Sequence, residues 1–175
     1  MNNERGFTLA ELLVACAIIG FVMAGIFTLQ QQGQSAYLWG SARVEVQQNA
    51  RLALDLMTRE LRSAQSVTTM GANCNNTTGA TTITFVDSGS TTITYTLNGT
   101  ILQRTVTATT SDVSGGVEAF RIFCYQSDGY SFAAAAADVR SILVRVGTRT
   151  EANPASGQAG AQHAIVESRV KLRNL

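Results

Sequence analysis

The fold of this chain is decided by a stretch near its N-terminus, which runs FTLAELLVACAIIGFVMAGIFTL from Phe7 to Leu29. Glu11 is the only charged side chain among these 23 residues. As a helix the stretch reaches roughly 34 Å, enough to cross a hydrocarbon core of about 30 Å. The stretch therefore predicts a membrane-spanning helix. A carboxylate inside a bilayer costs about 2.5–3.5 kcal/mol on insertion scales, so Glu11 requires an explanation.

Composition limits what the rest of the chain can be. Its 175 residues fit one domain, and 45% of them are hydrophobic while only 14% are charged. The net charge is +1, and the basic residues are Lys171 and twelve scattered arginines. Because they form no basic run, the sequence indicates no nucleic-acid partner.

Three interpretations compete for the N-terminus, which opens with the polar residues MNNERG. A secretory signal peptide would be cleaved at the small residues Ala15-Cys16-Ala17. A lipoprotein would use Leu13-Val14-Ala15-Cys16, with Cys16 carrying the lipid. Both interpretations leave the apolar stretch from Ile18 to Leu29 without a purpose in a mature soluble domain. The third interpretation cuts between Gly6 and Phe7 and keeps the whole span.

The run GFTLAELLVACAIIG, from Gly6 to Gly20, resembles the prepilin leader junction of type IV pilins and type II secretion pseudopilins. In that family a membrane peptidase cuts after the glycine and methylates the new N-terminal residue. The resemblance implies cleavage between Gly6 and Phe7, N-methylation of Phe7, and Glu11 as the family's membrane glutamate. It also implies a leader at 1–6 and a transmembrane segment at 7–29.

The same resemblance implies partners and a location. The partners would be the prepilin peptidase, other major and minor pilins or pseudopilins, the inner-membrane assembly platform and membrane lipid. The chain would cross the bacterial inner membrane once, with its C-terminal domain in the periplasm or outside, and would then enter a pilus or pseudopilus filament.

Two further stretches narrow the family. The helix segment QQNAR at 47–51 with LDLMTRELR at 54–62, and the ending VKLRN at 170–174, resemble PilW-type minor pilins and J-type pseudopilins. Major pilins usually carry a helix-kinking proline where this chain has Thr28, and its only proline is Pro154. The resemblance therefore implies a structural minor pilin that helps initiate, prime or cap a type IV pilus. The alternatives are a J-type minor pseudopilin and a membrane-anchored adhesin or DNA-uptake receptor. The receptor would use exposed residues such as Tyr125, Tyr130 and Phe132.

Glu11 acquires a purpose under this interpretation. Cleavage would leave a positive amine on Phe7, and Glu11 of one subunit could pair with that amine on the next. Such a pair would neutralise both charges and fix the axial register of the filament, a known use of buried ionic groups. The alternative is a glutamate that reaches the membrane surface or is protonated.

Helical periodicity continues beyond the membrane span. No proline interrupts Phe7 to Val67, which predicts one helix of about 60 residues, near 90 Å long. One apolar stripe comprises Ala50, Leu54, Met57, Leu61 and Ala64. We expect this stripe to face the chain's own sheet, and a seam for a neighbouring subunit is the alternative. Asp55 and Arg59, four residues apart, are placed to support the helix as an ion pair.

The remainder reads as β structure. Sixteen threonines lie between Thr68 and Thr110, and threonine favours strands. Strands are predicted at 81–87, 91–97, 100–106, 117–125, 139–147 and 164–172, with a loop at 150–162 and an undecided segment at 133–137. Asn98-Gly99 predicts a tight hairpin turn. The fold class is α+β: a pilin-like fold with a long N-terminal helix on a C-terminal antiparallel sheet. Residues 30–67 would continue the helix, and 68–175 would form the exported β-domain.

Residues that carry chemistry are scarce. His163 is the only histidine and is predicted to lie in a surface loop; the sequence has no metal-ligand spacing, cofactor motif or nucleophile motif, and so gives no basis for an enzyme. Cys74 and Cys124 would lie in an oxidising compartment, so we expect a disulfide between them, with two separate thiols as the alternative. Cys16 is expected to be a small apolar residue in helix packing.

Overall fold

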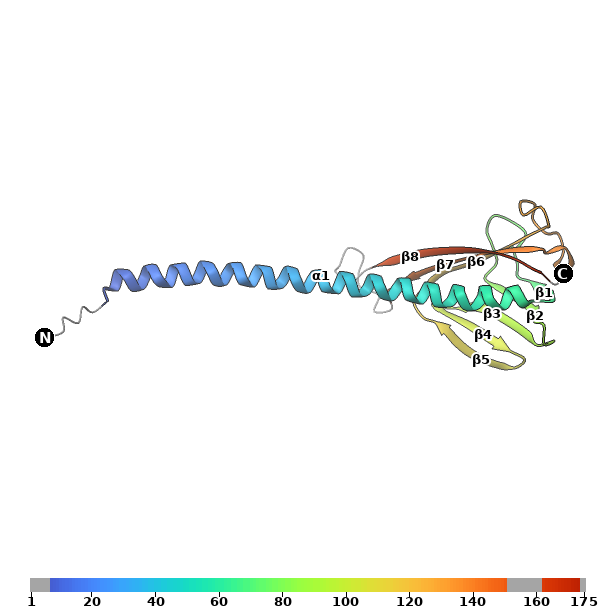
Figure 1. The fold of residues 1–175 in the computed structure, drawn as a ribbon, viewed down its shortest axis with the longest axis horizontal. Helices are drawn as coiled ribbons and strands as arrows, with labels where there is room; N and C mark the ends of the chain where they lie inside the picture. The colour runs from blue at the N-terminus through green and yellow to red at the C-terminus, as the bar shows by residue number, and fades with distance from the viewer. Residues whose placement is uncertain (1–6, 151–161, 174–175) are drawn as a thin grey trace.

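The computed structural model describes residues 7–150 and 162–173, and Figure 1 shows a β-domain from which one helix projects. Helix α1 spans Leu9–Ser63, 55 residues, about 82 Å. The strands follow in the order β1 (Ser66–Met70), β2 (Thr82–Val86), β3 (Thr92–Asn98), β4 (Ile101–Val106), β5 (Thr109–Ser114), β6 (Val117–Tyr125), β7 (Ser141–Arg149) and β8 (His163–Lys171). A short 3-10 helix, η1 (Ala136–Asp138), precedes β7 and resolves the undecided segment in part as a helical turn. The α+β prediction is confirmed.

The end of α1 lies earlier than predicted. Ala64 is the C-cap with an extended backbone, and Val67 belongs to β1, where it pairs with Phe85. The prediction of helix to Val67 was wrong because the sequence Ser66–Met70 contains a β-branched run that buries Val67 within the domain. Helix α1 therefore ends at Ser63, and β1 begins at Ser66.

Residues along α1 agree with one expectation and depart from another. The helix passes Thr28 without interruption, and the Thr28 hydroxyl donates to the Gly25 carbonyl at 2.7 Å. Within the described ranges, Asp55 and Arg59 form no ion pair, although their spacing permits one. Exposed i,i+4 pairs contribute only a few tenths of a kcal/mol, too little to fix two long side chains.

The strands form two antiparallel sheets where the sequence predicted one. The first has the order β1-β2-β3-β4-β5, and the second has the order β6-β7-β8. They separate at Gly115-Gly116, where Gly116 takes a φ of +65°. A single bridge between Ala80 and Ile122 joins them. Strands β1 and β5 were not predicted. The predicted helix extended into the start of β1, and β5 reads TTSDVS, which is mostly exposed and has no apolar alternation.

The β3–β4 hairpin also differs in its turn. Asn98 pairs with Ile101, so the two-residue loop is Gly99-Thr100 and not Asn98-Gly99. Gly99 has a φ of +61°, and neither Asn98 nor Thr100 has a positive φ. A glycine alone at the first turn position is typical of a type II′ hairpin. The turn therefore needs the positive φ of Gly99, whereas Asn98 is the last residue of β3.

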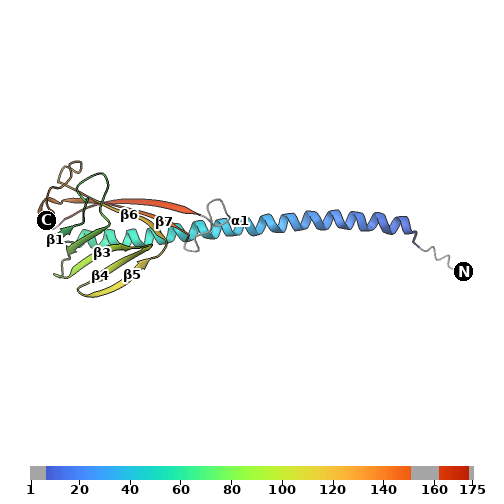
Figure 2. The same ribbon diagram turned by 180° about the vertical axis from the view of Figure 1, so that it is seen from behind.

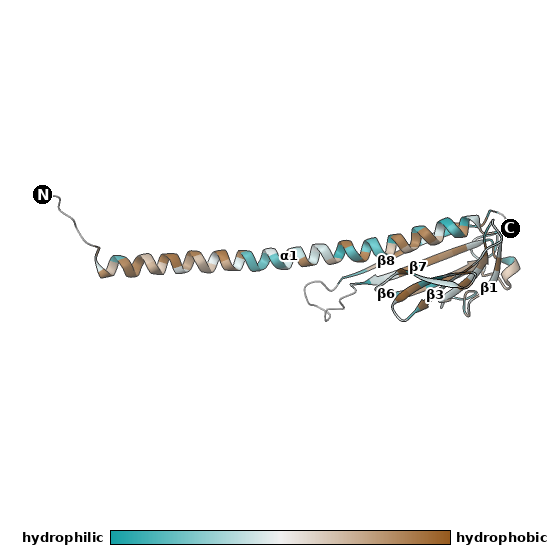
Figure 3. Cartoon of the chain, turned by 90° about the horizontal axis from the view of Figure 1, so that it is seen from below, coloured by the Kyte–Doolittle hydropathy of each residue, from teal (hydrophilic) through white to brown (hydrophobic). Residues whose placement is uncertain are grey.

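The rear half of α1 lies along the strands and closes the core (Figure 3). Ala50, Met57, Leu61 and Ala64 of the predicted stripe are fully buried, and Leu54 is partly buried against the core. The stripe packs within its own domain, among the largest buried side chains, which include Phe85, Tyr95, Phe120 and Ile142. The expectation that the stripe faces the chain's own sheets is confirmed.

Candidate functional site

The front of α1 stands clear of the domain. Every residue from Phe7 to Gln34 is exposed, including thirteen large apolar side chains between Phe7 and Leu29. Figure 3 shows this part as the apolar half of the helix, followed by a polar stretch. The helix is long and apolar enough to cross a membrane, and none of its apolar window is buried against the domain. An apolar surface of this extent requires a bilayer or a protein neighbour to cover it.

Glu11 has a partner inside its own chain. Thr8 is the N-cap of α1; its backbone N–H and its hydroxyl each donate to Glu11 Oε2 at 2.9 Å. The Glu11 N–H donates in return to the Thr8 hydroxyl at 3.3 Å. This reciprocal arrangement is a capping box, which satisfies two free donors at the helix start. The Thr-x-x-Glu spacing at 8–11 is the sequence signature of this capping box.

The two residues of the predicted cleavage site lie at the boundary of the described chain. Gly6 falls outside the described residues, while Phe7 is 91% exposed and directly precedes the N-cap. A new amine on Phe7 would therefore sit next to the capping box, within one residue of Thr8.

A neck connects the membrane segment to the domain. Tyr37, Leu38 and Trp39 are exposed, and the first buried residue of α1 is Ala42. An open groove of about 580 Å³ runs past Tyr37, Gly40 and Val44 on one side of the neck. Tyr37 lies about 45 Å from Phe7 along the helix, beyond a hydrocarbon core of about 30 Å. If residues 7–29 span a membrane, the neck presents apolar side chains outside it.

A comparison with known protein families finds a match at the start of this helix. The family model described as the prokaryotic N-terminal methylation motif matches residues 1–27, which hold the Gly6-Phe7 junction, Glu11 and most of the apolar span. The matched motif is the one that type IV pilin-like proteins carry at their N-terminus. No curated protein matched it closely enough to add a more specific relative. The motif implies processing by prepilin peptidase and assembly with pilins, and together with the apolar helix it is consistent with inner-membrane anchoring. A pilin-like chain is a structural protein, not an enzyme.

A polar network fixes the rear half of the pilin-like helix to the first sheet. The Tyr95 hydroxyl donates to Glu60 at 2.6 Å, and Arg104 donates to both Glu60 oxygens at 2.6 and 3.1 Å. The Glu60 side chain is only 16% exposed and that of Arg104 25%. Burial and then the adjacent Glu60 carboxylate raise the pKa of the Tyr95 phenol far above its ordinary value. The network ties α1 to β3 and β4 by charge-assisted hydrogen bonds.

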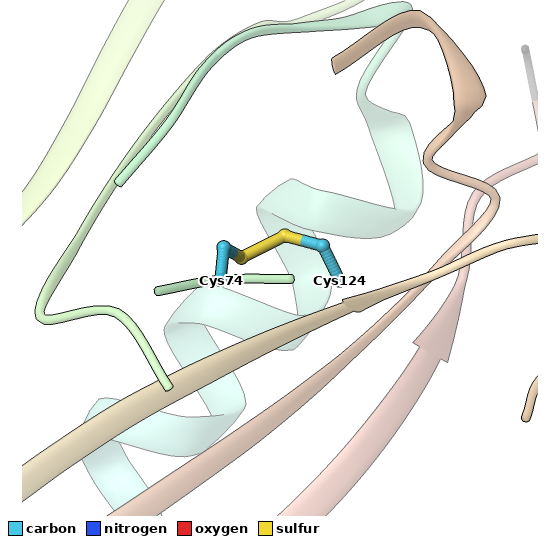
Figure 4. Close-up of a disulfide and its surroundings, with 2 residues drawn as sticks. All are labelled: Cys74 and Cys124. Carbon is cyan, nitrogen blue, oxygen red and sulfur yellow. A yellow bond between two sulfur atoms is a disulfide. The ribbon is translucent and has the colours of Figure 1, made fainter. Parts of the chain in front are cut away.

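The exported cysteines are bonded to each other in the structure. Figure 4 shows the disulfide between Cys74, in the β1–β2 connection, and Cys124 on β6. Both residues are buried, and their Cα atoms are 5.3 Å apart, within the usual range for a disulfide. The Cys124 N–H also donates to the Cys74 carbonyl at 2.8 Å. The pair holds a long loop against the second sheet. Cys16 lies exposed on the front of α1.

His163 opens β8 and is not in a loop, contrary to the prediction. It pairs with Arg149 across the sheet, and its Nδ1 lies 2.9 Å from Glu118 Oε2 on the surface. The predicted strand began one residue later, at Ala164. No group of three or more potential metal ligands occurs within residues 7–150 and 162–173.

The three aromatic candidates are brought together only in part. Tyr125 stacks on Phe132 with ring centroids 5.0 Å apart, and the Arg169 guanidinium lies 4.6 Å from the centre of the Tyr125 ring. Arg169 also donates to the Gly129 carbonyl. Tyr130 makes no ring contact and is 86% exposed on the intervening turn. Sequence reasoning missed Arg169, since only the β6–β7–β8 register places it beside Tyr125.

Proposed function

We propose that this chain is a minor subunit of a type IV pilus that helps to initiate, prime or cap the filament. Prepilin peptidase would cut after Gly6 and methylate Phe7. The segment 7–29 would then hold the subunit in the inner membrane until the assembly platform transfers that helix into the filament core. The β-domain would be displayed outside the core.

One observation carries the proposal: the exposed front of α1 and its rear half, which packs in the core of the domain, form one continuous helix. The front is continuous α-helix, and beyond its first turn the backbone groups pair within the helix, so it can sit in lipid or among other helices without refolding. The rear half is fixed by the apolar stripe and by Glu60. A displacement of the domain therefore moves the front helix with it.

Glu11 supports the proposal through its position at the helix start. In the single chain its carboxylate accepts from Thr8, so it enters the bilayer with two donors already in place. A carboxylate can accept more hydrogen bonds than these two. The amine on Phe7 of a neighbouring subunit would add the positive charge that neutralises it. The capping box and the pair between subunits are therefore compatible uses of one side chain.

A minor role is favoured over a major one by the membrane segment. Thr28 replaces the proline that would kink the helix, and α1 remains continuous there. A J-type minor pseudopilin of type II secretion would share this helix, the peptidase and the mode of assembly.

Purified filaments provide the test. We expect this chain in type IV pili at a small fraction of the major pilin, measured by quantitative mass spectrometry, and we expect pilus number to fall when the gene is deleted. Intact piliation in the deletion strain, together with a loss of secreted enzymes, would overturn the pilus assignment in favour of type II secretion.

The aromatic cluster favours a second candidate, a membrane-anchored receptor. Stacked Tyr125 and Phe132 beside Arg169, with Tyr130 exposed nearby, form a surface that could bind a planar or sugar ligand. Under this candidate the chain would remain in the membrane fraction, and binding of cells to a surface or uptake of DNA would depend on the cluster while pilus number would not.

A further inference from the structure

An arginine-lined cleft lies at the end of the molecule opposite the membrane helix. Arg59 and Arg62 on the last turns of α1 and Arg173 beyond β8 line an open cleft of about 450 Å³. Asp55 is the only acidic residue in the lining. Figure 2 shows that the end of α1 and the end of β8 lie at the pole farthest from the front helix. We refer to this feature as the arginine cleft.

The three guanidiniums of the arginine cleft are not used by the fold. All three are exposed, and within the described residues none forms a hydrogen bond, ion pair or ring contact. By contrast, the arginines at 104, 121, 140, 145 and 169 each have a hydrogen-bond partner inside the domain. Arg43, Arg51 and Arg149 also lack such a partner among the described residues, but they do not line the arginine cleft, whereas the other three unpaired guanidiniums lie together in it.

Charge in the arginine cleft is only partly balanced. Asp55 offsets one of the three positive charges, and the C-terminal end of the α1 dipole offsets about half of another. About one and a half positive charges remain. The hydroxyls of Thr58 and Ser63 already donate to the carbonyls of Asp55 and Glu60, so the guanidiniums are the donors available to a ligand.

We propose that the arginine cleft binds a pair of neighbouring carboxylates on an acidic segment of a different protein. Guanidinium forks match carboxylates by two parallel hydrogen bonds, and two carboxylates match the remaining charge. The cleft contains no aromatic side chain on which a base could stack, and it is compact, whereas a nucleic acid requires an extended basic surface.

A second copy of this chain does not fit as the occupant. Its acidic residues are spread singly, and the two closest in sequence are Asp55 and Glu60, of which Glu60 is already held by Arg104. The partner must therefore bring an acidic run that this chain lacks.

The test uses the full chain in neutral detergent micelles and fluorescein-labelled hexaglutamate as the probe. Binding is measured by fluorescence anisotropy at about 10 mM and about 150 mM salt, where the Debye length falls from about 30 to about 8 Å. The test variant is Arg59→Gln/Arg62→Gln/Arg173→Gln. The matched control is Arg43→Gln/Arg51→Gln, which removes two exposed arginines from the same helix outside the cleft.

We expect hexaglutamate, but not hexaglutamine, to bind the wild type and to bind more weakly at the higher salt concentration. Each arginine should contribute up to about fivefold, so the triple variant should lose about tenfold or more in affinity while the control variant loses none. Circular dichroism should show equal helix content in all three proteins. Equal affinity of the triple variant would overturn the proposal, as would a comparable loss in the control. Tighter binding of a hexathymidylate probe would also overturn it, by identifying a nucleic-acid surface instead.

Discussion

Under the proposed function Glu11 has two separable tasks, to cap its own helix and to pair with a neighbouring subunit, and three substitutions distinguish them. Glu11→Gln keeps an oxygen that can accept from Thr8 but removes the charge, since glutamine serves in capping boxes as well as glutamate does. Thr8→Ala removes the N-cap hydroxyl and keeps the charge. Glu11→Ala removes both the capping interaction and the charge.

The expected magnitudes differ enough to be resolved. Loss of an N-cap costs about 1 kcal/mol, which is a factor of about five. Leaving one charge of a buried pair without its partner costs about 3–5 kcal/mol, which is a factor of more than about 100. If Glu11 pairs with the neighbouring Phe7 amine, Glu11→Gln should abolish incorporation almost as fully as Glu11→Ala. Thr8→Ala should reduce it only modestly.

The assay compares the chain in the membrane fraction and in sheared filaments, at equal expression. All three variants should be exported, cleaved and folded, because the domain begins to bury residues only at Ala42. A Glu11→Gln variant that enters filaments like the wild type would show that the charge is not required for register. If Thr8→Ala and Glu11→Ala were equally impaired, the capping box would be the whole function of this carboxylate.

Four other predictions concern processing, the disulfide, Glu60 and Tyr95. The mature protein should begin with N-methylated Phe7 by mass spectrometry, whereas a lipid on Cys16 or a chain that begins at Ile18 would contradict the prepilin interpretation. Cys74 and Cys124 should appear as one cross-linked peptide in a non-reducing map, and replacing both with serine should lower the free energy of unfolding by about 4 kcal/mol, the loop-closure value for their separation of 50 residues. Two alkylatable thiols in protein from the cell envelope would refute that bond. Glu60→Ala should lower the free energy of unfolding by about 3 kcal/mol, because it leaves Arg104 largely buried without its carboxylate. The folded-state pKa of the Tyr95 phenol is raised, so its contribution to stability should be complete below pH about 10 and should decline above it. Tyr95→Phe should remove this decline in urea unfolding measured against pH, and an unchanged decline would assign it to another group.

The sequence predicted the elements whose signals are local. An unbroken apolar run defined the front helix, a stripe with helical spacing defined the buried face of its rear half, and alternation located six of the eight strands. The two missed strands, β1 and β5, have few apolar side chains, and their pairing depends on neighbours distant in sequence. The division into two sheets could not be predicted either, because it depends on a change in the direction of the chain at Gly115-Gly116.

In the candidate site, too, the residues with a local sequence signal were predictable, and those brought together only by the fold were not. Phe7 was identified from the resemblance of the Gly6–Gly20 run to a prepilin junction, and Glu11 from its charge within the apolar run as well. The Thr8 cap could have been found from its spacing to Glu11. Arg104 and Arg169 could not, since only strand register brings each beside its partner. The arginine cleft was hidden for a further reason. Arg59 and Arg173 are separated by most of the β-domain in sequence, and scattered arginines showed no cluster until the fold brought the two chain segments to one pole.

The two ends of α1 therefore pose opposite physical problems. At the front, apolar side chains in helical backbone require only an apolar environment, so bilayer and filament core can exchange without a change in the chain's own structure. At the far end, exposed guanidiniums are well solvated when free, so a partner there must offer charge to offset the loss of water. A subunit built in this way can be held by lipid at one pole while its other pole is free to bind a different protein.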